Sequence, residues 1–146
     1  MKRTFLIVLS FTFLLTGCSV NTSDENNNQV YRYLWHLVNV TGGISGVDEQ
    51  FSLDTVVWVF DEVNGKITVT NSNDDPEKED GLDSGVYDFS IQTIDGNTFL
   101  TVGNTEIGGI TFPSLEEMIL NENETSSGPG SDGFIYNFQR TVEVVQ

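Results

Sequence analysis

Apolar and polar side chains alternate at every second residue along several short stretches of this chain. The pattern is clearest in residues 55–61, where Val56, Trp58 and Phe60 share one face. Successive side chains of a β-strand point to opposite faces of a sheet, so this period predicts strands with one buried face. The same period predicts further strands at residues 31–40, 66–70, 86–94, 98–102, 105–112 and 134–145.

Turn signals separate these stretches. The pairs Asn64-Gly65, Asp95-Gly96 and Gly103-Asn104 are each typical of a tight connection between neighbouring strands. Short strands at regular spacing predict an all-β fold, and consecutive strands joined by tight turns favour an antiparallel meander. Closure of the meander into a barrel removes exposed strand edges. We therefore expect an antiparallel β-barrel of about eight strands.

Two stretches fit this scheme less clearly. Residues 47–54 are expected to connect two strands, with a short helical turn. Residues 115–121 contain good helix formers, but Pro113 and the short length favour a strand.

The N-terminus has the pattern of an export signal. Lys2 and Arg3 precede an apolar run of eleven residues, Phe5 to Leu15. A membrane-spanning helix needs roughly 20 apolar residues, so this run is typical of a signal peptide rather than a span. We expect residues 1–17 to be removed.

The residues that follow the run are Leu15, Thr16, Gly17 and Cys18. They resemble the processing box of bacterial lipoprotein precursors. The resemblance implies that Cys18 becomes the first mature residue, with a diacylglycerol thioether and an amide-linked acyl chain that anchor it to a membrane. The alternative is an ordinary secretory signal with a cysteine near its cleavage site. Ser19, in place of aspartate, implies delivery to the outer membrane. Two alternatives are left for the side on which the domain lies, the periplasmic face and the cell surface.

The chain then divides into three parts. Residues 1–17 are the expected signal peptide, residues 18–29 the lipidated cysteine and a flexible polar tether, and residues 30–146 the barrel domain. Cys18 is the only cysteine, so lipidation leaves no thiol for a disulfide or for catalysis. The domain must be held by its core, and about 115 residues are enough to bury one.

The charge balance excludes one class of partner. Without residues 1–17, four basic side chains face 22 acidic ones, a net charge of −18. Such a chain has no basic patch to neutralise phosphates, which excludes nucleic-acid binding.

Several short motifs together resemble the small lipocalin-like lipoproteins of Bacteroidetes-type bacteria. They are an early Trp-x-Leu strand, a second Trp-x-Phe strand, a central Gly-x-Tyr-x-Phe and a final segment rich in aromatic residues that ends in arginine. The resemblance implies a lipocalin-like barrel, closed at its base by a cation–π contact between a tryptophan and an arginine. The residues are Trp35 and Leu37, Trp58 and Phe60, Gly85, Tyr87 and Phe89, and 132–140; the implied pair is Trp35 and Arg140.

Residues with catalytic or metal-binding chemistry are sparse. His36 is the only histidine, and no nucleophile–base pair can be assembled around it, so we expect a structural histidine, no enzymatic activity, no cofactor and no zinc site. The loop 71–85 is rich in carboxylates that suit Ca²⁺, but its spacing fits no EF-hand. A solvated acidic loop is the favoured interpretation, and Ca²⁺ binding stays open.

The alternating aromatic side chains leave two hypotheses for function. They line a cavity for a small apolar ligand, or they fill the barrel and leave the loops 41–54 and 71–85 to contact an envelope protein. A continuous interior cavity of roughly 300 Å³ or more supports the first hypothesis, and a packed interior removes it. The residues expected to contact a ligand are Trp58, Phe60, Tyr87, Phe89 and Tyr136.

Overall fold

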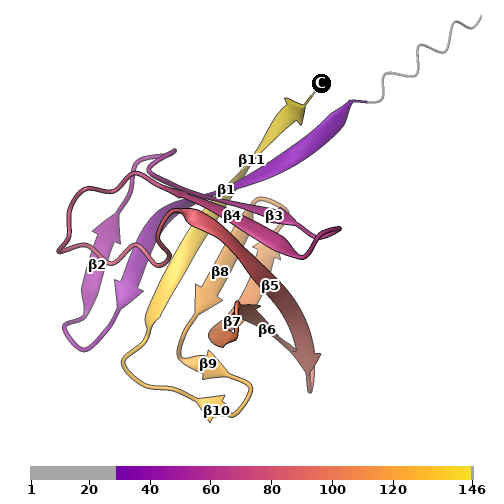
Figure 1. Ribbon diagram of the computed structural model, residues 1–146. Helices are drawn as coiled ribbons and strands as arrows, with labels where there is room; N and C mark the ends of the chain where they lie inside the picture. Colours follow the sequence, from indigo (N-terminus) through magenta and orange to yellow (C-terminus); the bar gives the residue numbers. More distant parts are fainter. Residues whose placement is uncertain (1–28, 146) are drawn as a thin grey trace, which may run out of the picture.

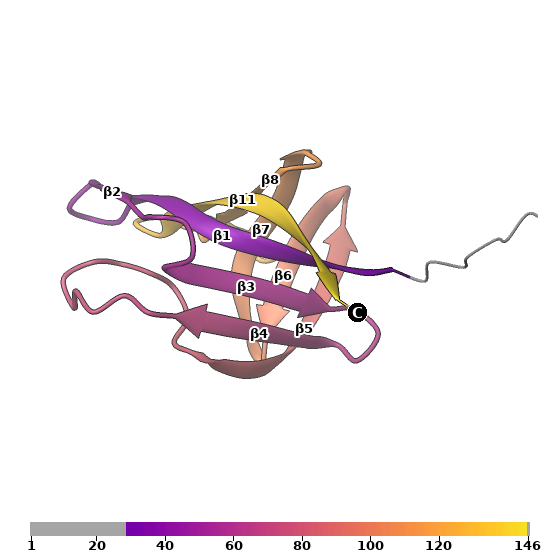
Figure 2. The ribbon, with the colours of Figure 1, turned by 90° about the horizontal axis from the view of Figure 1, so that it is seen from above.

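The computed structural model describes residues 29–145 of the chain. This part contains eleven β-strands, joined by turns and loops, and no helix. Eight of them form a closed antiparallel barrel in the order β1, β3, β4, β5, β6, β7, β8 and β11, in which β11 pairs back with β1 (Figures 1 and 2). The predicted all-β barrel of about eight strands is confirmed. The barrel strands are β1 (Val30–Gly42), β3 (Val56–Asp61), β4 (Lys66–Asn71), β5 (Gly85–Ile94), β6 (Asn97–Val102), β7 (Thr105–Ser114), β8 (Glu117–Asn121) and β11 (Phe134–Val145).

Three short strands lie outside the barrel ring. Strand β2 (Val47–Gln50) folds back on the end of β1, so the expected helical turn in residues 47–54 is wrong. Gly43 and Gly46 adopt positive φ angles of 68° and 65° in the intervening turn, which let the chain reverse within four residues. Strands β9 (Glu124–Thr125) and β10 (Gly128–Pro129) form a small hairpin between β8 and β11.

A β-bulge in β1 changes which residues face the interior. The pairing with β11 shifts between Leu37 and Asn39, so Val38 is an extra residue on the β1 side. Strict alternation places Val40 on the face opposite Trp35 and Leu37, but the bulge turns it inward, where it is fully buried. Val40 thus lies inside the barrel because of the bulge, and not on the outer face to which strict alternation assigns it.

The first half of β1 and the second half of β11 extend beyond the barrel as a two-stranded ribbon (Figures 1 and 2). Arg32 and Glu143 form an ion pair across it at 2.5 Å. The ribbon exposes several apolar side chains: Val30, Tyr31, Tyr33, Val142 and Val144. We call the end of the barrel next to this ribbon the ribbon end. The opposite end, with the β1–β2 turn and residues 72–84 and 122–133, is the loop end.

The middle of the barrel is filled by its own side chains. The rings of Trp58 and Phe138 lie 4.8 Å apart between their centroids, and Leu37, Ile67 and Met118 around them are fully buried. This packing separates the two ends of the barrel. Within residues 29–145 there is no helix long and apolar enough to cross a membrane.

Gly108 allows two strands to approach closely at a second bulge, between β6 and β7. A Cβ atom added to Gly108 would clash with the carbonyl oxygen of Asn121 on β8, so Gly108→Ala should lower the unfolding free energy by about 3 kcal/mol. Gly46→Ala is the matched control: its φ is also positive, but no atom lies within 4 Å, and the expected cost is about 1 kcal/mol. Urea denaturation of both variants checks this, and equal costs contradict it.

Candidate functional site

A cavity of about 270 Å³ opens at the ribbon end of the barrel. We call it the cup. Most of its wall is aromatic or aliphatic and comes from five barrel strands. The side chains of this wall include Tyr33, Trp35, Phe60, Phe89, Ile91 and Phe112.

Arg140 supplies the one basic side chain of the cup, and Glu62 supplies its one acidic side chain. Its guanidinium carbon lies 4.6 Å from the ring centroid of Tyr33 and 5.8 Å from that of Trp35, within the range of a cation–π contact. The pair that the lipocalin resemblance implied is thus in contact, with Tyr33 as an additional partner. No carboxylate of residues 29–145 lies within ion-pair distance of Arg140, so its positive charge is available to the cup.

The rim of the cup exposes large apolar side chains. Phe112 is 52% exposed although its ring packs 5.6 Å from that of Trp35, and Leu115 in the β7–β8 turn is 79% exposed. Covering apolar surface of this kind with a ligand or another surface lowers the free energy. The cup therefore has the composition of a site for an apolar molecule.

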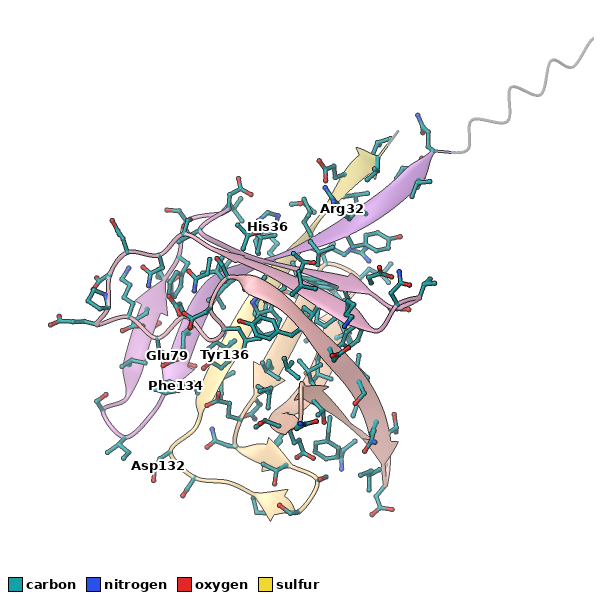
Figure 3. The ribbon with its side chains drawn as sticks, viewed as in Figure 1. Arg32, His36, Glu79, Asp132, Phe134 and Tyr136 are labelled. Atoms are coloured by element: carbon teal, nitrogen blue, oxygen red, sulfur yellow. The ribbon has the colours of Figure 1, made fainter. Side chains whose placement is uncertain are left out.

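A second, smaller cavity of about 190 Å³ lies at the loop end. Its polar wall is formed by Tyr136, Glu79 and Glu122, which come from β11 and from the two long loops. The Tyr136 hydroxyl lies 2.8 Å from a Glu79 carboxylate oxygen and 3.2 Å from one of Glu122 (Figure 3 labels Tyr136 and Glu79). Burial, together with the negative charges of the two glutamates, holds the pKa of Tyr136 well above its ordinary value.

The five aromatic residues predicted to contact a ligand do not surround one cavity. Phe60 and Phe89 line the cup, with their ring centroids 5.1 Å apart. Trp58 and Tyr136 line the loop-end cavity, and the Tyr87 hydroxyl donates to the carbonyl of Asp83 at 2.9 Å, outside both. Sequence reasoning left Tyr33, Phe112 and Leu115 out of the ligand set. Tyr33 and Phe112 can be recognised in the sequence as aromatic residues, but no pattern in the sequence indicates that they lie beside Phe60 and Phe89.

His36 is buried and has partners on both ring nitrogens. Its Nε2 lies 2.8 Å from the hydroxyl of Thr141, and its Nδ1 accepts from the backbone N–H of Asp54 at 3.3 Å. Figure 3 shows His36 near the base of the ribbon, away from Tyr136 and Glu79. These contacts attach both β11 and the β2–β3 connection to β1, which is a structural role.

Three of the six carboxylates of the acidic loop 71–85 accept hydrogen bonds, those of Asp75, Glu79 and Asp80. Asp75 accepts from the backbone N–H of Glu77, and Asp80 accepts from the amide of Asn73. Among residues 29–145, no group of three or more potential ligands could hold a metal ion. The expected signal peptide, residues 1–17, the lipidation site Cys18 and the tether up to residue 28 lie outside the described residues.

Comparison with known proteins adds no relative: no family model, no curated protein and no solved structure matches this chain. The barrel and its two cavities are therefore the basis for a functional conclusion.

The shared hydrogen bond of Tyr136 predicts a specific pH dependence. Its pKa is raised in the folded state, so above the ordinary value of 10 the unfolded chain ionises first and the fold loses stability as the pH rises. The stability difference between the native chain and Tyr136→Phe should fall by up to about 1.4 kcal/mol per pH unit in this range. Urea denaturation between neutral and alkaline pH measures it; the other tyrosines are common to both proteins, and parallel curves contradict the prediction.

Proposed function

We propose that this chain is a lipid-anchored envelope lipoprotein whose lipocalin-like barrel binds a small apolar ligand in the cup, without catalysing a reaction. The observation that carries this proposal is the cup itself, an aromatic-lined cavity of about 270 Å³ that is open at its rim. Its size is close to the lower end of roughly 300–1,000 Å³ at which small-molecule sites occur. The expectation of a continuous interior cavity is not met, because the middle of the barrel is packed. The proposal therefore concerns the cup at the ribbon end and not the barrel interior as a whole.

The position of Arg140 indicates which kind of apolar ligand complements the cup. Its guanidinium lies on the rings of Tyr33 and Trp35, and no carboxylate of the described residues, Glu62 of the cup included, lies within ion-pair distance of it. Contact with two aromatic faces removes part of its hydration and strengthens its interaction with an anion. An amphiphile with an apolar body and one anionic end therefore complements the cup better than a neutral hydrocarbon.

The proposed anchor is compatible with the position of the barrel's first strand. Cys18 lies twelve residues before Val30, a length of chain that spans at most about 40 Å. Strand β1 begins in the ribbon, so the ribbon end and the cup are the parts of the domain nearest to the anchor along the chain. We propose the outer membrane as the location, on either its periplasmic or its surface face. The high negative charge keeps the rest of the domain away from anionic headgroups.

A second candidate function is an interaction with an envelope protein through the loops 41–54 and 71–85. Two observations favour it: the interior is packed at its middle, and the loop 41–54 exposes Ile44 at 90% and Leu53 at 53%. Exposed apolar side chains at a loop tip are suited to contact a partner. The cup requires neither of these residues, so the two functions can be tested separately.

The ligand proposal predicts saturable binding of a medium-chain carboxylate. Isothermal titration calorimetry should show decanoate binding more tightly than decanol, because only the former pairs with Arg140. Ser114→Trp places a large ring in the cup and should weaken decanoate binding at least about tenfold. Ser90→Trp, on an exposed β5 position that does not line the cup, is the matched control. Equal binding by both variants contradicts the site.

The anchor proposal predicts a change of cell fraction. Cys18→Ala removes the only thiol that can carry a diacylglycerol, so the protein should leave the membrane fraction or accumulate unprocessed. Ser19→Ala, one residue away, should be anchored normally. Fractionation with metabolic labelling by a fatty acid measures both. A Cys18→Ala protein that is still labelled with the fatty acid contradicts lipidation at this cysteine.

A further inference from the structure

The loop-end cavity has more hydrogen-bond acceptors than donors. One hydroxyl hydrogen of Tyr136 serves two carboxylates, and the other donors to them are the backbone N–H of Gly81 for Glu79 and that of Phe134 for Glu122. One oxygen of Glu79, Oε2, has no donor among residues 29–145. In the same part of the chain, no lysine, arginine or histidine lies within ion-pair distance of either glutamate.

An unpartnered donor lies in the wall of the same cavity. The Trp58 side chain is only 1% exposed, and its Nε1–H has no hydrogen-bond partner among the described residues. The part of the ring next to it faces Gly81: a Cβ atom added at Gly81 would lie 3.7 Å from Cζ2, a carbon bonded to the same ring atom as Nε1. Burying an indole N–H without an acceptor is unfavourable, so a bound molecule that supplies an acceptor at this point is favoured.

These two mismatches are complementary. The carboxylates lack a cation, and the indole lacks an acceptor, while Leu82, Ile107 and Leu120 supply apolar wall between them. We propose that the loop-end cavity binds a small organic cation of the amino-alcohol type. Its ammonium donates to Glu79 and Glu122, its hydroxyl oxygen accepts from Trp58, and its hydrocarbon body packs on the apolar wall.

Two further features favour an organic cation over other ligands. A cavity of about 190 Å³ suits a molecule much smaller than a lipid, and the strongly acidic chain attracts cations from solution. Only two carboxylates line it, and the described residues hold no group of three that could bind a metal. The site lies at the opposite end from the cup and does not depend on the proposed function of the cup.

The test is a titration of the full-length chain in detergent, followed through the indole N–H signals in NMR spectra. Three probes of similar shape separate the contributions: phenylethanolamine, phenethylamine, which lacks the hydroxyl, and α-ethylbenzyl alcohol, which replaces the ammonium by a methyl group. Phenylethanolamine should shift the Trp58 signal saturably. Phenethylamine should bind about fivefold more weakly, because it offers Trp58 no acceptor, and the neutral alcohol should not bind in the same range.

Variants assign the effect to these residues. Glu79→Gln and Glu122→Gln keep the side-chain shape and should each weaken phenylethanolamine binding at least about tenfold. Trp58→Phe should abolish the preference for phenylethanolamine over phenethylamine. Glu62→Gln, which removes a carboxylate from the cup instead, is the matched control and should leave phenylethanolamine binding unchanged. Backbone amide spectra of each variant confirm that it is folded.

Three outcomes overturn the proposal. The native chain shows no saturable shift of the Trp58 signal with phenylethanolamine, the neutral alcohol binds as tightly as the ammonium probes, or Glu62→Gln weakens binding as much as Glu79→Gln does. The first of these needs no variant and so does not depend on how the substituted chains fold. Loss of decanoate binding in the cup leaves the result unaffected, which separates the two sites.

Discussion

Pairing of β1 with β11 is the constraint on which the rest of the structure depends. These are the first and last strands of the described chain, and they pair from Val30 with Val145 to Gly42 with Phe134. Without this seam the other strands form an open sheet with two exposed edges. The seam also assembles both cavities. Trp35 and Arg140 face each other across it in the cup, and Tyr136 enters the loop-end cavity from β11.

The acidic side chains help to hold this disulfide-free domain together, in addition to charging its surface. Glu49 accepts from the backbone N–H of Glu79, and Glu122 accepts from that of Phe134, so carboxylates fix one long loop to β2 and the other to β11. Hydrogen bonds from the side chain and backbone of Asn64 lower the pKa of Asp61. Those from the hydroxyl and backbone of Ser126 lower the pKa of Glu106. An acidic composition thus supplies acceptors for loop N–H groups that no strand satisfies.

The period of two was sufficient to predict the barrel because it depends only on which side chains are apolar. It failed where the backbone departs from regular pairing. Val40 lies inside because of a bulge, and residues 47–50 form a strand because glycines reverse the chain before them. A bulge leaves no clear signal in the pattern of side chains, since one extra residue can be accommodated at many positions.

The same limitation explains the outcome for the ligand site. Alternation shows that Trp58 and Phe60 share the inner face of β3, but not that they serve different ends of the barrel. Two residues along a strand span about 7 Å, enough to cross from one cavity to the next when the middle is packed. The contact of Trp35 with Arg140 could be predicted only through a family resemblance, because nothing in their spacing brings them together.

Trp58 is the side chain that separates the two cavities. One neighbour of its ring is Phe60, a wall of the cup, at 6.3 Å between centroids, and another is Phe138, at 4.8 Å. Its N–H edge faces the loop end. Close-packed interiors deform little, so a ligand at either end is confined there by this aromatic partition. The partition gives one small barrel an apolar cup with a basic side chain at one end and a polar cavity with two carboxylates at the other.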